Sequence, residues 1–143
     1  MILQLSVFLQ NKSGKIAAIT QALWEANVDI RALTIADTTD FGILRMLVSD
    51  VDQAKEALRR MNCVVSTNEV VVLAVPDVTG GLSELLTLLA RENVDIEYMY
   101  SLVVRGSSDA YMVLRVCDET RLLQVLERSG IRTVSPETLQ IKM

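Results

Sequence analysis

Apolar residues recur along the chain at two spacings, and each spacing predicts one type of element. Residues 2–9 are rich in apolar side chains with partial alternation, which predicts a strand. Ile16, Ile19 and Leu23 then follow at intervals of three and four residues, as on one face of an amphipathic helix. The same reasoning predicts further strands near 30–36 and 43–48, a helix at 51–61 and a short strand near 64.

The second half of the chain repeats the first. The tetrapeptide Asn27-Val28-Asp29-Ile30 recurs as Asn93-Val94-Asp95-Ile96, at an offset of 66 residues. Further on, Val48-Ser49-Asp50 matches Val116-Cys117-Asp118 at an offset of 68. The extra residues fall opposite residues 37–43, a polar stretch where a hairpin loop tolerates insertion. Two amphipathic stretches can resemble each other by chance, but ordered matches with one short gap favour a duplication.

Both copies predict the element order β-α-β-β-α-β. In the second copy the predicted elements are strands at 70–75, 96–104 and 110–116, helices at 82–92 and 120–129, and a last strand at 138–141. This order is that of the ferredoxin-like α+β fold, an antiparallel sheet with two helices on one face. We therefore expect two units, residues 1–68 and 69–143. Only Ser66-Thr67-Asn68-Glu69 links them, so the units are expected to pair side by side.

Composition excludes several classes of function. Half of the 143 residues are apolar, enough for a core, and His is absent. Without His there is no His-based acid–base catalysis, no Ser–His or Cys–His nucleophile and no His-ligated metal. The chain has 14 basic and 18 acidic residues, a net charge of −4, and only 4% aromatics. Nucleic-acid binding needs a basic, aromatic face, so no nucleic-acid partner is expected.

Cysteine usage and hydropathy indicate the compartment. Cys63 and Cys117 are far apart in apolar stretches and form no CxxC motif, which predicts free thiols in a reducing cytoplasm. No apolar run approaches the roughly 18 residues of a spanning helix. The opening residues also lack the basic run of a signal peptide, so no membrane association is expected.

Several motifs follow one another in a specific order. Each copy runs strand, [Asn/Asp]-x-x-Gly, helix, Asn-Val-Asp-Ile, strand, and the stretches Leu33–Arg45, Val75–Leu82 and Asp95–Tyr100 fit the same pattern. In this order the chain resembles the ACT domain, the small amino-acid-sensing module of regulated metabolic enzymes, and above all the stand-alone tandem ACT proteins. The resemblance implies a non-catalytic, cofactor-free regulatory protein. It also implies an amino acid or similar effector bound between ACT units, a homodimer, and a metabolic enzyme or regulator as partner.

The resemblance also implies where the ligand binds. It places ligand contacts at Asn11 and Asp29, contributed by opposite subunits of a side-by-side pair. The residues themselves suit this role, because the turn Asn11-Lys12-Ser13-Gly14 offers free backbone N–H groups at the positive end of a helix dipole to a carboxylate. Gly14 permits close backbone approach, and Asp29 can accept a hydrogen bond from an ammonium group.

The second copy offers the equivalent candidates Asp77, Gly80, Gly81 and Asp95, with altered charge. Asp77 takes the place of Asn11, and an anionic side chain repels a ligand carboxylate. The lysines at 12 and 15 are also lost, to valine and glycine. Residues 1–68 have 7 basic and 7 acidic residues, whereas 69–143 have 7 and 11, so the whole net charge of −4 lies in the second copy. The better carboxylate site is therefore expected in the first copy.

Pairing of the two units within one chain predicts composite sites. The Asn11 loop then meets Asp95 in one site, and the Asp77 loop meets Asp29 in the other. Pairing between two chains remains an alternative.

Less specific interpretations stay open. The glycines also suit ordinary turns, the two Asp residues can satisfy backbone groups, and Asn27 and Asn93 suit helix ends. A structural assembly module without a small ligand is the main alternative function. An enzyme on the same fold is disfavoured, since residues 11–15 lack the catalytic Arg of an acylphosphatase-like phosphate loop.

Overall fold

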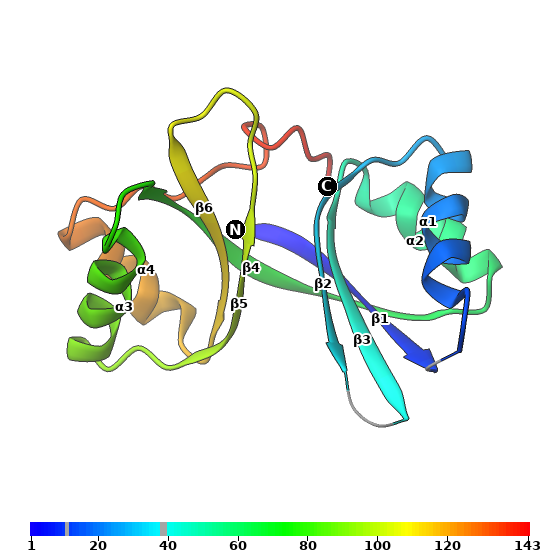
Figure 1. Ribbon diagram of the computed structural model, residues 1–143, viewed down its shortest axis with the longest axis horizontal. Helices are drawn as coiled ribbons and strands as arrows, with labels where there is room; N and C mark the ends of the chain where they lie inside the picture. The colour runs from blue at the N-terminus through cyan, green and yellow to red at the C-terminus, as the bar shows by residue number, and fades with distance from the viewer. Residues whose placement is uncertain (11, 38–39) are drawn as a thin grey trace. The chain divides into compact units, whose positions relative to one another are not determined.

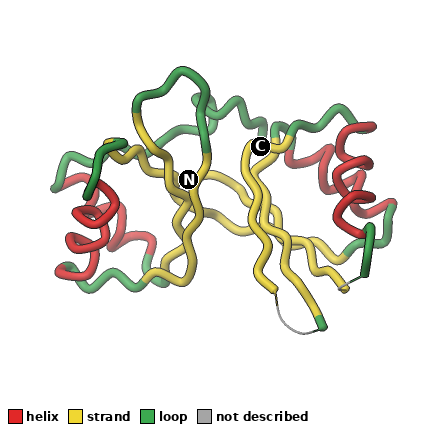
Figure 2. Tube along the Cα trace, viewed as in Figure 1, coloured by secondary structure: helices red, strands yellow, loops and turns green. Residues whose placement is uncertain are grey.

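The described residues form ten regular elements, in the order that the duplication predicts. The computed structural model describes residues 1–10, 12–37 and 40–143. The elements in chain order (Figures 1 and 2) are β1 (Ile2–Gln10), α1 (Lys15–Glu25), β2 (Ile30–Asp37), β3 (Phe41–Val48), α2 (Val51–Arg60), β4 (Val64–Pro76), α3 (Gly81–Arg91), β5 (Ile96–Leu102), β6 (Asp109–Val116) and α4 (Glu119–Arg128).

These elements divide into two compact units. The N-terminal unit consists of Leu3–Glu69 with Pro136–Met143, and the C-terminal unit consists of Val70–Ser135 with Met1–Ile2. In each unit taken by itself, both helices lie on one side of the strands (Figure 1). Each unit therefore has the helix-on-sheet layering of the ferredoxin-like α+β fold, which confirms the predicted fold class.

Strand order within each unit follows the same plan. In the N-terminal unit the order is β2-β3-β1-β4, and in the C-terminal unit β4 is followed by β6 and then β5. The pairs β1–β3, β2–β3, β4–β6 and β5–β6 are antiparallel, with Val7 opposite Leu44 and Leu73 opposite Met112. Because opposite residues in such pairs share a face, these apolar positions build one buried surface in each sheet.

Two parts of the expected secondary structure are wrong. Residues 66–69 are not a linker but part of the continuous strand β4, because the β-branched residues around them favour extended backbone. The expected strand at 138–141 is absent. Residues 136–140 form hydrogen-bonded turns, with Gln140 at φ 54°, which no strand accommodates. Past these turns, Lys142 makes a parallel bridge with Asp50 within the N-terminal unit.

Each unit packs its helices on the sheet through a short apolar stripe. In the N-terminal unit Ile19 and Leu23 of α1, and Leu58 of α2, are fully buried. In the C-terminal unit Leu85 and Leu89 of α3 join a buried cluster with residues of β4, β6 and α4. The four-residue spacing within each stripe places its members on one helix face, which is why the sequence pattern predicted these helices correctly.

The turns of the two units also repeat each other. Residues just before or just after the helices take the left-handed conformation at equivalent positions of the two units. The equivalent pairs are Gly14 and Gly80 (φ 82° and 87°), Asn27 and Asn93 (φ 59° and 57°), and Asn62 and Gly130 (φ 58° and 68°). Asn27 and Asn93 come directly after the helix ends, which confirms their expected role there. The backbone thus supports the duplication that the sequence matches predict.

Gly81, the first residue of α3, lies against the end of β4. A Cβ atom at this position would lie 2.4 Å from the carbonyl oxygen of Pro76, which is closer than atoms can approach. The strand end and the helix start can therefore come this close only because residue 81 has no side chain.

Replacement of this glycine should destabilise the C-terminal unit. Alanine is favoured over glycine in helices by at most about 1 kcal/mol, whereas overpacking against a backbone atom costs about 1–3 kcal/mol. We expect Gly81→Ala to lower the free energy of unfolding, measured by urea denaturation followed by circular dichroism. Ser83→Ala, at an exposed position of the same helix, is the matched control and should change stability by less than about 0.5 kcal/mol. An unchanged or higher unfolding midpoint for Gly81→Ala would contradict the close approach.

Candidate functional site

The loop before α1 forms hydrogen-bonded turns at a helix start. Lys12 N donates to the Gln10 carbonyl at 2.7 Å, which turns the chain sharply after β1, and Lys15 N donates to the Lys12 carbonyl at 3.3 Å. Gly14 is the N-cap residue, and no side chain of the described residues caps the helix. The first turn of α1 contains no acidic residue. The loop Lys12–Gly14 is therefore a positively polarised helix start, while Asn11 lies outside the described residues.

The loop before α3 has the same backbone but the opposite charge. Val78 N donates to the Pro76 carbonyl at 2.9 Å, and Gly81 N donates to the Val78 carbonyl at 3.0 Å. Gly80 is again an uncapped N-cap residue, but Glu84 lies in the first turn and Asp77 lies in the loop. These carboxylates offset the helix dipole, so this loop is a poor place for a ligand carboxylate.

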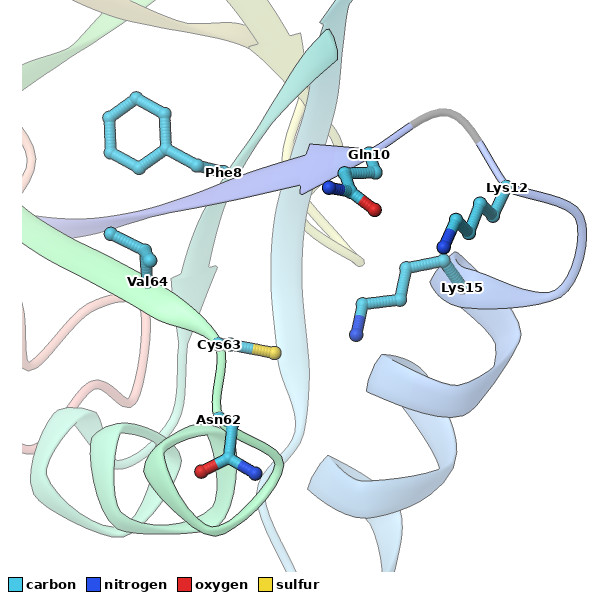
Figure 3. Close-up of a pocket in the computed structure, with 7 residues that line it drawn as sticks. All are labelled: Phe8, Gln10, Lys12, Lys15, Asn62, Cys63 and Val64. Carbon is cyan, nitrogen blue, oxygen red and sulfur yellow. The ribbon is translucent and has the colours of Figure 1, made fainter.

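A pocket opens beside the first loop, within the N-terminal unit. It has a volume of about 310 Å³ and is lined by Phe8, Gln10, Lys12, Lys15, Asn62, Cys63 and Val64. Figure 3 shows the Lys15 side chain extending from the start of α1 toward Cys63, whose sulfur points back toward it. The residues come from the end of β1, the α1 start and the α2–β4 turn, three segments that only the fold brings together.

The C-terminal unit has the equivalent pocket with a different lining. It measures about 350 Å³ and includes Pro76, Gly81, Glu84 and Ile131. By the repeat offsets, Pro76 and Gly81 correspond to Gln10 and Lys15. Glu84 is the only charged residue among those that line this pocket. The duplication has therefore kept a pocket of similar size and reversed the sign of its charge.

Asp29 lies at the other end of α1 and is already paired. Its carboxylate forms an ion pair with Arg31 at 2.8 Å, and Arg31 also donates to the Gln140 side-chain oxygen at 3.3 Å. The Asp29 backbone N–H donates to the Ser49 hydroxyl at 2.8 Å. Asp29 thus has a structural role at the α1–β2 turn, whatever else it binds.

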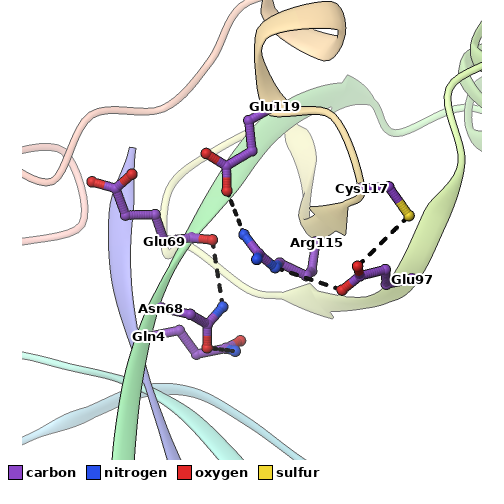
Figure 4. Close-up of polar contacts among 7 residues, drawn as sticks. All are labelled: Gln4, Asn68, Glu69, Glu97, Arg115, Cys117 and Glu119. Carbon is purple, nitrogen blue, oxygen red and sulfur yellow. Dashed lines mark hydrogen bonds and ion pairs between the residues drawn. The ribbon is translucent and has the colours of Figure 1, made fainter.

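Asp95, the equivalent residue of the C-terminal unit, has a different neighbourhood. Its backbone carbonyl accepts from Cys117 N at 3.2 Å, but its carboxylate has no ion-pair partner within the part of the chain that the structure describes. Where the first unit has Arg31, the second has Glu97, which pairs with Arg115 at 3.6 Å and accepts from the Cys117 thiol at 3.6 Å (Figure 4). Asp95 is therefore the less neutralised of the two candidate ammonium acceptors.

The predicted site residues separate into two groups in each unit. Lys12, Ser13 and Gly14 lie together at the start of α1, whereas Asp29 follows its other end. The helix has 11 residues, which corresponds to about 16 Å. The same separation holds between the Gly80 loop and Asp95 across α3. One unit alone cannot hold the carboxylate and the ammonium group of a single amino acid with these residues.

Sequence reasoning missed most of the pocket lining, including Phe8, Gln10, Asn62 and Cys63. The local sequence pattern does not mark these residues as neighbours of the loop. The one usable signal is Asn62, a residue type that tolerates the left-handed conformation, and in the structure its φ of 58° turns the chain from α2 into β4. The described residues contain no cluster of three or more metal-ligating side chains. Within the same residues, each helix is too short or too polar to traverse a lipid bilayer.

Comparison with known proteins identifies the family. The model of the ACT domain pair matches residues 1–142, so the chain belongs to the ACT family as a pair of ACT domains. The crystal structure of protein BT0572 from Bacteroides thetaiotaomicron is 37% identical, with 97% of this chain and 95% of that chain covered and a TM-score of 0.89. No curated protein matches the chain.

More distant structures share the fold. The ligand-free regulatory subunit of aspartate kinase from Thermus thermophilus is 14% identical, with 89% of this chain and 91% of that chain covered and a TM-score of 0.62. The aspartate kinase of Clostridium acetobutylicum is 14% identical, with 89% of this chain and 32% of that chain covered and a TM-score of 0.52. The family membership confirms the resemblance inferred from the repeats and points to a regulatory, ligand-binding domain rather than a catalytic one.

The acidic surroundings of Cys117 give a test of the electrostatics near Asp95. Desolvation of the thiol, its hydrogen bond to Glu97 and the negative charges of Glu97 and Asp95 raise the pKa of Cys117. Glu97→Gln removes the nearest charge, so the pKa of Cys117 should fall and more thiolate should be present at neutral pH. We expect faster alkylation of Cys117 by iodoacetamide between about pH 7 and 9. The rate is measured by mass spectrometry, with Cys63 as the internal control. An equal or slower rate would show that Glu97 does not oppose thiolate formation.

Proposed function

We propose that the protein is a non-catalytic regulator that binds a free amino acid and changes the activity of a partner in response. The ligand carboxylate binds at the Lys12–Gly14 loop, and the ligand ammonium group binds at Asp95. The observation that carries this proposal is the charge contrast between equivalent positions of the two units. The first unit has lysines at its uncapped helix start, and the second has an unneutralised Asp beside its β5 strand.

The proposal requires two units to contribute to one site, because each group of residues lies at the opposite end of its own 11-residue helix. We propose that the second unit comes either from the same chain or from a partner chain in a homodimer. Both cysteines are free in the structure, which is consistent with a cytoplasmic protein.

A metabolic enzyme is the proposed partner. Structures with the same fold include two regulatory subunits of an enzyme, aspartate kinase. An amino acid can alter such a partner only if it binds more tightly to one arrangement of the ACT units than to another. A site made from two units meets this condition, because its affinity depends on their arrangement.

A structural assembly module without a small ligand is the second candidate. It is favoured by exposed apolar side chains on the edge strand β2, where Leu33 and Ile35 are 49% and 44% exposed, and by Trp24 on α1, which is 78% exposed. Such surfaces recruit protein partners.

A thermal-shift screen of the standard amino acids distinguishes the two candidates. The sensor proposal predicts a saturable rise in the unfolding temperature with one amino acid or a few related ones, because a ligand stabilises the state that binds it. The assembly module predicts no shift with any of them.

Calorimetry with the best ligand then tests the site. Asp95→Asn keeps the shape of the side chain but removes its charge, and we expect affinity to fall about tenfold or more. Asp29→Asn is the matched control, since the Asp29 carboxylate is already paired with Arg31, and its affinity should change less than about threefold. Equal losses in the two variants, or a loss only in Asp29→Asn, would refute the assignment of the ammonium site.

A further inference from the structure

The pocket of the N-terminal unit carries charge of one sign. Lys12 and Lys15 are its charged lining residues, and no Asp or Glu lines it. Neither lysine has an ion-pair partner among the residues that the structure describes. The other polar groups are the amides of Gln10 and Asn62 and the thiol of Cys63 (Figure 3), all of which can donate hydrogen bonds.

The duplicated pocket shows that these lysines are not needed to build the fold. In the C-terminal unit the same corner, formed by a strand end, a helix start and the turn after the second helix, folds with Val78 and Gly81 at the equivalent positions. That pocket is similar in size, about 350 Å³ against 310 Å³, but has no cation and contains Glu84. Stability of the fold therefore does not account for the two lysines of the first pocket.

Size and charge together define the class of ligand. A volume of about 310 Å³ lies at the small end of the range for metabolite pockets. Two neighbouring ammonium groups without a counter-charge favour a carboxylate over an uncharged group of the same shape, because charge-assisted hydrogen bonds are the stronger ones. A ligand ammonium group, in contrast, is repelled from this pocket and has to lie outside it.

From these observations we infer that the pocket is an anion subsite that binds the second acidic group of a small dicarboxylic effector. The inference rests on the proposed function and specifies its ligand, since the α-carboxylate binds at the adjoining loop and the side-chain carboxylate enters the pocket. The effector is then an amino acid with an acidic side chain, and the pocket binds this amino acid more tightly than the corresponding uncharged amide.

Calorimetry with matched pairs of ligands tests this inference. Aspartate is compared with asparagine and glutamate with glutamine, because each pair differs only in the charge of the side-chain group. We expect at least one acid to bind about tenfold more tightly than its amide, and the difference to shrink as salt is raised from about 0.05 to 0.5 M. Succinate, which has two carboxylates and no ammonium group, is measured in parallel.

Variants show whether the discrimination depends on the pocket. Lys12→Val and Lys15→Met together remove both cations, and the second retains the apolar stem of the lysine. In this double variant the acid should lose its advantage over the amide. Lys55→Met removes an exposed lysine of α2 in the same unit, outside this pocket, and should preserve the advantage. Circular dichroism confirms that each variant is folded.

Alkylation of Cys63 reports directly on occupancy, because Cys63 lines the pocket. Saturating acid ligand should slow the iodoacetamide reaction of Cys63 several-fold, as measured by mass spectrometry. The same ligand concentration should not slow the reaction in the Lys12→Val/Lys15→Met variant.

The possible outcomes separate the two proposals. Equal affinities for acid and amide, or a preference that survives loss of both lysines, would overturn the subsite while leaving amino-acid binding intact. If no amino acid binds but succinate binds through the lysines and protects Cys63, the proposed function fails and the anion subsite stands. Absence of binding by all of these compounds would overturn both.

Discussion

A left-handed glycine that turns the chain from a strand directly into a helix is the constraint on which each unit depends. Gly14 and Gly80 adopt φ values of 82° and 87°, which other residues reach only with strain. The helix begins at this turn without a capping side chain among the described residues, so the positive end of its dipole faces the loop. The first N–H of each helix, at Lys15 and Gly81, donates to a carbonyl within the loop. The same turn fixes where the helix starts relative to the strand end, and so determines the corner in which the pocket forms. Fold and candidate site therefore have one common cause.

Duplication has conserved this backbone frame and changed the chemistry placed on it. The hydrogen bonds of the two loops correspond one to one, and the left-handed positions Gly14, Asn27 and Asn62 recur as Gly80, Asn93 and Gly130. Among the residues that differ, Lys15 at the pocket is replaced by Gly81, and Arg31 beside Asp29 is replaced by Glu97. Lys15 and Arg31 lie outside the buried apolar core, so loss of their charges removes no core contact. The outcome is one unit with a basic pocket and one with an acidic surface near its β5 strand.

Sequence alone predicts the helices, the order of elements along the chain and the repeat, because these follow from local periodicity and turn chemistry. It fails at residues 66–69 and 138–141, where tertiary pairing and a left-handed Gln140 decide the conformation. It also identifies the Lys12–Gly14 loop as a helix start, whereas Asn11 lies outside the described residues. The remainder of the pocket is not predictable in this way, since Gln10 and Cys63 are distant in sequence and meet only after the sheet has formed. The neutralisation of Asp29 by Arg31 likewise depends on side-chain geometry that no spacing rule contains.

Neither of the two units corresponds to one continuous stretch of the chain. Strand β4 contributes residues to both units, and the last eight residues of the chain, Pro136–Met143, complete the unit that begins at Leu3. A gene divided after residue 69 would encode two fragments, each missing a piece that the other retains. Each copy of the duplicated module therefore depends on residues encoded outside it to form a complete unit.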